Sequence, residues 1–250
     1  MGHDERTVPP NLCPSWKHRT RRWLNSRVIV PTVPLIPGID LLHADAALLV
    51  LDKPAGLLAV PGRGADKQDC LSARAQQWIA DALIVHRLDM ATSGLMLMAR
   101  GAAMQRELSR AFAERQVHKR YVAVVDGHLD APAGDWGVID LPILADWPRR
   151  PLRIIDARGQ ASVTRWRVLA LELGADGQPQ TRLELEPVTG RSHQLRVHLQ
   201  AIGHAILGDA LYASAQVQAR SERLLLHASA LSLQHPVSRA PLHFGQPPDF

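Results

Sequence analysis

The sequence predicts a globular fold that combines β-strands with α-helices. With 250 residues, 46% of them hydrophobic, the chain can bury a core in one large domain or two small ones. Short apolar or alternating runs at 48–51, 95–98 and 119–125 have the length and the period of strands. The segments 71–83 and 102–116 instead repeat their apolar residues at helical spacing. Elements of both kinds therefore alternate along the chain.

The folded part of the chain is expected to begin near residue 37. Its first predicted strand, 48–51, runs into a turn in which Pro54 and Gly56 take typical turn positions. The helix predicted over 71–83 has an apolar face made of Leu71, Ala75, Trp78, Ile79 and Ala82. This helix leads into the segment that is richest in chemically active side chains.

That segment, 86–93, lies between the apolar runs 83–85 and 95–98. It brings together an imidazole, a guanidinium, a carboxylate and two hydroxyls, from His86, Arg87, Asp89, Thr92 and Ser93. If 95–98 is a buried strand, Asp89 lies on a loop at the rim of a sheet, where catalytic groups concentrate. Asp89 could equally be a loop carboxylate that caps neighbouring backbone N–H groups.

The next predicted elements are a helix and a strand. The helix, 102–116, has an apolar face of Met104, Leu108 and Phe112 and a basic face that could meet either solvent or RNA. The strand, 119–125, places Tyr121 and Ala123 on one face. The segment 126–151 is rich in Gly and Pro and is expected to be a long surface excursion with short elements.

Four later runs also have the pattern of strands. Two of them alternate with period two, 162–169 and 182–186, so that each presents one face to the core. The other two, 224–228 and 230–233, are expected to form a hairpin.

A short helix is predicted between Ser192, a good N-cap, and Gly203, a good C-cap. Its buried stripe consists of Leu195, Leu199 and Ile202. Arg196 lies one position round the helix from this stripe, so its guanidinium borders the core and requires a carboxylate partner.

The formal net charge of +5 makes a polyanion, and nucleic acid first, the natural partner. Residues 1–36 form a basic, Pro-rich extension in which Trp16, Trp23 and five Lys or Arg side chains stand close together. Cations on phosphates and indoles on bases are what a protein uses to hold single-stranded RNA. The extension is therefore either an arm that touches RNA or a disordered leader.

Several function classes are not supported by the sequence. No apolar run reaches the roughly 20 residues that span a bilayer, and no signal peptide opens the chain, so we expect a cytoplasmic protein. His86, Asp89 and Ser93 lack the nucleophile elbow of a hydrolase. Cysteines and histidines lack metal-binding spacing, and no phosphate-cradling Gly-rich loop is present. We expect neither a metal nor a cofactor.

Taken in order, the polar motifs resemble those of RluA-type RNA pseudouridine synthases. The resemblance covers about residues 41–250 and rests on four motifs: His86-Arg87-Leu88-Asp89 with Thr92-Ser93-Gly94, Lys119-Arg120-Tyr121, Gly190-Arg191-Ser192-His193-Gln194-Leu195-Arg196, and Gly208-Asp209. Lys53-Pro54-Ala55-Gly56-Leu57 resembles the opening strand and turn of the family. Ala91 and the run from Asp146 to Pro151 add similarity to the dual-specificity branch, which modifies a tRNA anticodon loop and a hairpin of 23S rRNA.

The resemblance implies a single α+β catalytic domain over 37–250, with a mixed, largely antiparallel sheet, flanking helices and an RNA-binding cleft. It implies an enzyme, expected to be a monomer, that isomerises uridine to pseudouridine in loops of 23S rRNA, of a tRNA anticodon stem-loop, or of both. The alternative is a catalytically silent RNA-binding module. Such a module would not need Asp89, Tyr121 and Arg196 together.

The resemblance also assigns roles to residues. Asp89 would act at the ribose, either by attacking C1′ or by helping to remove a proton from C2′, with Arg196 as its ion-pair partner. Tyr121 would stack on the extruded base, and Arg87 would fill the gap that the base leaves. The other polar residues of the motifs are expected to bind RNA: His86, Thr92, Lys119, Arg191, His193 and Gln194.

Overall fold

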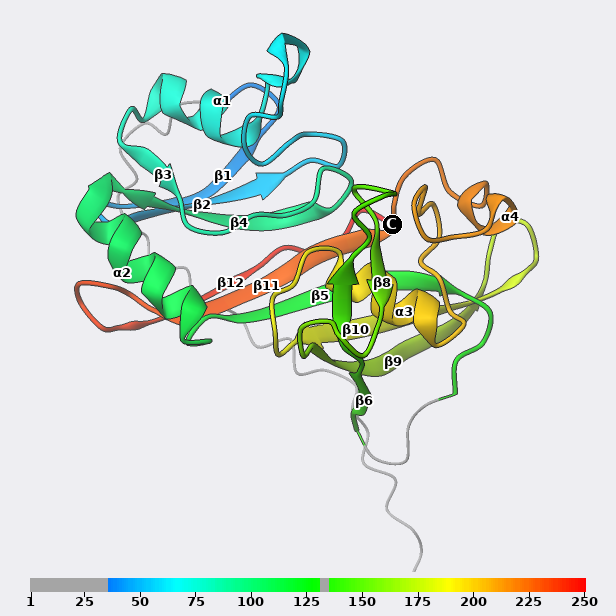
Figure 1. Ribbon diagram of the computed structural model, residues 1–250. Helices are drawn as coiled ribbons and strands as arrows, with labels where there is room; N and C mark the ends of the chain where they lie inside the picture. Colours follow the sequence, from blue (N-terminus) through cyan, green and yellow to red (C-terminus); the bar gives the residue numbers. More distant parts are fainter. Residues whose placement is uncertain (1–35, 131–134) are drawn as a thin grey trace, which may run out of the picture. The chain divides into compact units, whose positions relative to one another are not determined.

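The computed structural model describes residues 36–130 and 135–250 (Figure 1). These residues belong to one compact unit, Val33–Phe250. The predictions made for the N-terminal extension, 1–36, concern positions that lie, except for the last, outside the described residues. No helix in the described part of the chain is both long enough and apolar enough to cross a membrane.

A 10-stranded sheet forms the centre of the fold. Along it the strands follow the order β1 (Asp40–Ala44), β2 (Leu48–Lys53), β4 (Ser93–Arg100), β11 (Leu226–Gln234), β5 (His118–Asp126), β10 (Pro179–Pro187), β9 (Val163–Leu173) and β6 (Gly137–Asp140). Two short strands, β3 (Ala82–Ile84) and β12 (Pro241–Gly245), pair with β4 and β11. Neighbours are antiparallel except β4 and β11, which are parallel. The predicted mixed, largely antiparallel α+β fold is therefore confirmed.

Helices cover both faces of this sheet. They are α1 (Leu71–Trp78), α2 (Gly101–Ala113), α3 (Gln194–Ala201) and α4 (Ala215–Gln218), with a 3₁₀ turn η1 (Ala65–Lys67). A separate hairpin of β7 (Ile143–Ala145) and β8 (Arg153–Ile155) packs against α3 (Figure 1). It lies in the segment that the sequence predicts to be a surface excursion.

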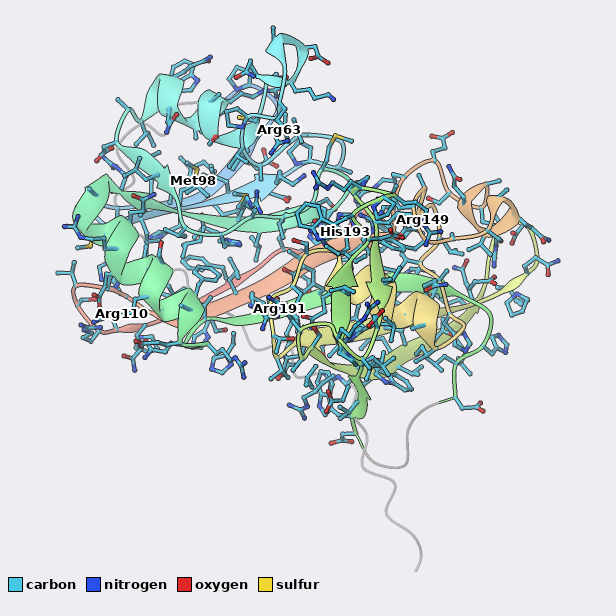
Figure 2. All side chains as sticks on the ribbon, viewed as in Figure 1. Arg63, Met98, Arg110, Arg149, Arg191 and His193 are labelled. Atoms are coloured by element: carbon cyan, nitrogen blue, oxygen red, sulfur yellow. The ribbon has the colours of Figure 1, made fainter. Side chains whose placement is uncertain are left out.

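Alternating side chains of β2 and β4 enter two different cores. Leu49, Leu51, Met96 and Met98 pack beneath α1, where Figure 2 shows Met98 between that helix and the sheet. Their neighbours in sequence, Leu48, Val50, Leu95 and Leu97, pack beneath α2 on the opposite face. Both strands are thus buried on two sides, which explains why their sequences are continuously apolar.

A third core, beneath α3, lies on the same face of the sheet as the core beneath α1. On β11, Leu226 belongs to the former and Ala228 to the latter, and residues two apart in a strand share a face. Tyr121 of β5 packs against both cores. The side chain of Tyr121 therefore lies at the junction between the two halves of this face.

Two predicted elements differ from the structure. The helix predicted over 71–83 ends at Trp78, whose side chain is 50% exposed. Ala82 closes a turn by donating its N–H to the Ile79 carbonyl, and the following residues then pair with β4. The predicted hairpin of 224–228 and 230–233 is one strand, β11, with a bulge where the turn was expected. Its hairpin partner is β12.

Gly94 is required by the parallel pairing of β4 with β11. Its φ of 110° is one that residues with a side chain rarely adopt, and an added Cβ would collide with the backbone of Ala228. The close approach of these two strands fixes the end of the loop that carries Asp89. Gly94 therefore allows the loop that carries Asp89 to end next to β11, in the middle of the sheet.

Replacing Gly94 with alanine should lower the free energy of unfolding by about 3 kcal/mol, because backbone strain adds to overpacking. Gly177 is a matched control, since its φ is 72° but nothing lies within 4 Å of an added Cβ. Gly177→Ala should cost only about 1 kcal/mol, from strain alone. Chemical denaturation of the two variants measures the difference. Equal losses would contradict a close approach at Gly94.

Candidate active site

A cavity of about 710 Å³ opens on the sheet face that α1 and α3 share. Its walls come from the loop between β3 and β4, from β5, from the loop before α3, and from α3 itself. All ten residues selected from the sequence as catalytic or RNA-binding line this cavity. A larger cavity of about 1440 Å³, lined by Asp52, Arg223 and His227, contains none of the ten.

Asp89 and Arg196 meet in the smaller cavity, although they are 107 residues apart in the sequence. Nη1 of Arg196 donates to Oδ2 of Asp89 at 3.3 Å. The contact that the sequence predicted is therefore present. Arg196 is 4% exposed, whereas the side chain of Asp89 keeps 28% of its surface open to solvent. The carboxylate can thus be reached from the cavity while its partner stays in the core.

The principal partner of Arg196 is a second carboxylate, that of Asp209. Nε of Arg196 donates to Oδ2 of Asp209 at 2.8 Å, and Nη2 donates to Oδ1 at 2.6 Å. Asp209 is 1% exposed and also accepts the backbone N–H groups of Leu211 and Tyr212. A two-point contact of this kind fixes the plane of the guanidinium and leaves Nη1 directed at Asp89.

From the sequence, Gly208-Asp209 is recognisable only as part of a motif, and no role for Asp209 was predicted. The available signal was the requirement of Arg196 for a carboxylate, which applies to Asp209 as much as to Asp89. Spacing alone could not tell which acid would lie beside the helix. In the structure both acids do, and the buried one is the better partner.

The N-terminus of α3 differs from the prediction. The N-cap is His193, not Ser192, and His193 has a left-handed backbone with φ of 57° and makes no capping hydrogen bond. The side chain of Gln194 organises the preceding loop instead. Its amide contacts Thr189 Oγ1, Val163 O and Thr164 Oγ1 and accepts the N–H of Arg191. These partners hold the loop before the helix, so the helix begins one residue later than predicted.

Three residues predicted to bind RNA use their side chains within the protein or bury them. Gln194 is 3% exposed and has the four partners just described. Thr92 is 3% exposed at the wall of the cavity. His86 accepts the N–H of Leu97 through Nε2 at 2.8 Å and stacks on Phe112. The hydrogen bonds of His86 and Gln194 hold the loops of the site, and Thr92 is buried. That these residues bind RNA stays a prediction.

The chemistry of His86 agrees with its part in holding the loop. Burial lowers the pKa of His86 to about 3, so its imidazole is neutral and can accept a hydrogen bond at neutral pH. His198 is fully buried between Thr164 Oγ1 and the Leu141 carbonyl. Within residues 36–130 and 135–250, no group of three or more His, Cys, Asp or Glu is placed to hold a metal ion.

Tyr121 projects from β5 into the cavity. Its hydroxyl has no hydrogen-bonding partner among the described residues, and its ring is held by the two cores on either side. Burial, together with the charge of Asp89, raises the pKa of Tyr121 above its usual value, so the hydroxyl keeps its proton at neutral pH. The site therefore offers a flat aromatic surface and a neutral hydroxyl close to Asp89.

The rim of the cavity is basic. Arg87 and Arg191 are exposed, and Lys119 lies half-buried with Nζ 5.9 Å from the centroid of the Phe112 ring. Figure 2 shows Arg191 and His193, which belong to the loop that precedes α3. Arg153 of β8 and Arg115 also line the opening. The rim can thus meet an anionic ligand that reaches the carboxylate beneath it.

Lys53 fixes the position of the loop that follows Asp89. It is fully buried at the end of β2, and its Nζ donates to the carbonyl oxygens of Pro54, Leu57 and Met90. One ammonium group therefore ties the turn after β2 to the residue next to Asp89. Burial lowers the pKa of Lys53 to about 8. From the sequence, this lysine is recognisable only as part of the opening motif.

The comparisons with known proteins agree on one family. The family model described as RNA pseudouridylate synthase matches residues 47–201. The dual-specificity RNA pseudouridine synthase RluA of Yersinia pestis is 46% identical over 204 residues, which are 81% of this chain and 96% of the relative. The protein of the same name from Escherichia coli (strain K12) is 44% identical over 218 residues, 87% of this chain and 96% of the relative.

Two solved structures are similar to this chain over most of its length. Human RNA Pseudouridylate Synthase Domain Containing 1 has a TM-score of 0.71 and 27% identity, covering 87% of this chain and 86% of that one. Human RNA Pseudouridylate Synthase Domain Containing 4 has a TM-score of 0.62 and 29% identity, covering 83% and 87%. Fold and sequence motifs therefore indicate the same relatives.

The lowered pKa of Lys53 predicts how stability changes with pH. Between about pH 8 and pH 10.5, the unfolded chain keeps the Lys53 proton while the folded chain has lost it, so stability rises with pH in this window. Relative to Lys53→Met, the wild type should gain about 3 kcal/mol of unfolding free energy across the window. Denaturant titrations at several pH values measure this gain. Exposed Lys67, changed to Met, is the matched control and should show a flat difference; a flat difference for Lys53→Met as well would refute the prediction.

Proposed function

Because this chain belongs to the RNA pseudouridylate synthase family, we propose that the cavity around Asp89 is where it isomerises uridine in RNA to pseudouridine. The enzyme is an RNA pseudouridine synthase of the RluA type. The observation that carries the assignment of the site is the contact between Asp89 and Arg196 beside Tyr121. A carboxylate that is reachable from the cavity, a fixed guanidinium and an aromatic ring meet there.

The reaction needs no outside group donor. The bond between N1 of the base and C1′ of the ribose breaks, and a bond between C5 and C1′ forms. C5 then loses its proton and N1 gains one, so atoms and electrons balance within the nucleotide. A single carboxylate can serve this chemistry, either as a nucleophile at C1′ or as a base that helps to remove the C2′ proton.

Asp89 is suited to either role because it is both reachable and held. Its side chain faces the cavity, and Nη1 of Arg196 approaches one oxygen at 3.3 Å. Asp209 fixes Arg196, so the guanidinium stays in the core while the Asp89 carboxylate faces the cavity. Arg196 would therefore orient Asp89 toward the ribose and would interact with the carboxylate while its charge changes during the reaction.

Tyr121 would receive the flipped base. A cavity of about 710 Å³ lies within the range of sites that hold small ligands. The Tyr121 ring, fixed between two cores, gives a surface on which a base can stack. Its hydroxyl, which keeps its own proton at neutral pH and has no partner among the described residues, would assist removal of the C5 proton as a relay, accepting that proton while its own passes to solvent.

The exposed cations at the rim would bind the RNA backbone around the flipped nucleotide. Arg87, Lys119 and Arg191 surround the opening, and phosphate contacts of this kind supply affinity that does not depend on sequence. Arg87 is exposed two residues before Asp89, so it can enter the gap that the extruded base leaves in the RNA.

We further propose that the substrates are structured loops of rRNA, of tRNA or of both. This proposal is supported by relatives that carry the name dual-specificity RNA pseudouridine synthase. We propose that the enzyme acts as a monomer in the cytoplasm, with 37–250 as the catalytic domain. The contribution of residues 1–36 to RNA affinity stays a prediction. A silent RNA-binding module would leave the joint presence of Asp89, Arg196 and Tyr121 in one cavity unexplained.

The function can be tested by mapping pseudouridine in total RNA from cells with and without this protein. Loss of sites in tRNA, in rRNA or in both identifies the substrates, and the wild-type chain should restore them. Asp89→Asn should not, with turnover at least about 100-fold lower in vitro. Its thermal midpoint should stay within about 3 °C of wild type, because Arg196 keeps its pair with Asp209.

Asp69→Asn is the matched control for this substitution. Asp69 also pairs with an arginine, Arg74, but on the exposed surface beside α1 and away from the cavity. It should restore every pseudouridine. Turnover of Asp89→Asn within a few fold of wild type would refute the assigned role of Asp89.

Substitution of Tyr121 separates stacking from proton transfer. Tyr121→Phe keeps the ring, so it should bind RNA normally and lose turnover. Tyr121→Ala should also weaken binding by about 10- to 100-fold, because stacking a base on an aromatic ring is worth about 1–3 kcal/mol. Binding titrations and single-turnover assays measure both effects. If the two variants behaved alike in binding, the stacking role would be wrong.

A further inference from the structure

Tyr212 connects three parts of the site through its hydroxyl and its ring. The hydroxyl accepts the backbone N–H of Arg153, in β8, at 3.0 Å, and it lies 2.6 Å from Nδ1 of His193. The ring of Tyr212 packs edge-on to His193 and lies 5.0 Å below the guanidinium of Arg196. Tyr212 follows Asp209 closely, and its own N–H is bound by that carboxylate. Tyr212 thus contacts Arg153, His193, Arg196 and Asp209, which lie around Asp89.

The proton inventory of Tyr212 and its partners favours one direction for its hydrogen bond with His193. The backbone N–H of Arg153 can only donate, so the Tyr212 oxygen accepts there and keeps its single proton for another partner. Nδ1 of His193 is that partner, at 2.6 Å. A neutral imidazole that accepts at Nδ1 carries its proton on Nε2. Nε2 is the atom that faces Asp89, 3.8 Å from Oδ2.

The opposite arrangement is disfavoured by the charge of Asp89. If Nδ1 donated to Tyr212, the neutral ring would present the lone pair of Nε2 to a carboxylate. Asp89 and Asp209 are the acidic groups that face His193, and Arg196 and Arg153 are the basic ones. Burial lowers the pKa of His193, which favours the neutral ring. A neutral imidazole with its N–H toward Asp89 presents a donor to the carboxylate and adds no further positive charge beside Arg196 and Arg153.

The backbone of His193 supports a role in the site. Its φ of 57° lies in the left-handed region, which is uncommon for a residue with a side chain. At the N-cap of α3 its side chain makes no capping hydrogen bond and is bound to Tyr212 instead. Strain of this kind persists where the surrounding structure holds a side chain in a functional position.

We propose that Tyr212 is a positioning residue, whose hydroxyl holds His193 with its Nε2 proton toward Asp89. His193 is then the second group, beside Arg196, that orients the carboxylate. The gap of 3.8 Å is longer than a hydrogen bond, so the N–H dipole acts on Asp89 electrostatically. The same hydroxyl ties the β7–β8 hairpin to this group through Arg153. The inference rests on the proposed function of Asp89.

The proton on His193 can be observed directly by ¹⁵N NMR of the imidazoles in the full-length, ¹⁵N-labelled protein. The signals of His193 are identified by their absence from His193→Gln. Buried His198 is an internal reference, because its Nε2 must donate to the Leu141 carbonyl, and its ring therefore also carries the proton on Nε2. Wild type should show the Nε2–H form at both residues. Tyr212→Phe should convert His193 to a mixture of tautomers and leave His198 unchanged.

The kinetic arm uses the same variant. Tyr212→Phe keeps the ring beneath Arg196 and loses only the hydroxyl, so kcat should fall about 10- to 100-fold. KM for RNA should change by less than about twofold, since no contact with the substrate is removed. A proton on Nδ1 in the wild type, unchanged His193 signals in Tyr212→Phe, or an unchanged kcat would each overturn the proposal.

Failure of the proposed function gives a different result. In that case the wild type itself would form no pseudouridine, and the spectra alone would still decide whether Tyr212 holds the Nε2–H form of His193. A general loss of structure in Tyr212→Phe would appear as a shift of the His198 signals. Such a shift would mean that Tyr212 supports the fold instead of positioning His193, and would also overturn the proposal.

Discussion

The arrangement of the site depends on the buried guanidinium of Arg196. Removing this charge from water is costly unless its donors are matched, and Asp209 matches two of them from within the core. A further donor, on Nη1, reaches Asp89 at the edge of the cavity. A helix, the turn that follows it and a distant loop are thereby joined at one charged group. The position of the Asp89 carboxylate is in this way set partly by the core and not by its own loop alone.

The loop that carries Asp89 is also held by groups that lie away from its carboxylate. His86 binds the backbone of Leu97 near its start, and Lys53 binds the Met90 carbonyl immediately after Asp89. Gly94 then allows β4 to approach β11 where the loop ends. The polar residues of this motif therefore divide into two kinds. Some support the backbone from below, while Arg87 and Asp89 face the cavity. Such a division keeps the reactive group fixed while it remains accessible.

The local sequence pattern correctly predicted strands that are buried on both faces. It failed at positions where pairing between strands sets the end of an element. The runs of β2 and β4 were recognisable because both faces of these strands are buried. The end of α1 was not recognisable, because Ile79 to Ile84 continue the apolar helical pattern. The chain leaves the helix there because β3 pairs with β4. The bulge in β11 similarly looked like a turn. His193 could not be recognised as the N-cap, since the side chain of Gln194 delays the helix through contacts with β9.

The sequence by itself determined the membership of the site, because the motifs that supply Asp89, Tyr121 and Arg196 can be recognised from residue types and their order. It also determined that Arg196 needs an acid, since a guanidinium at the border of a core must be paired. Only the tertiary structure decided that Asp209 is the main partner and Asp89 the second, and that His86 and Gln194 form hydrogen bonds within the protein. The reason is physical: which polar groups become buried together depends on contacts between distant segments, such as those of Asp89 and Arg196, which are 107 residues apart. Those contacts follow from how the sheet pairs its strands and not from the spacing within any one motif.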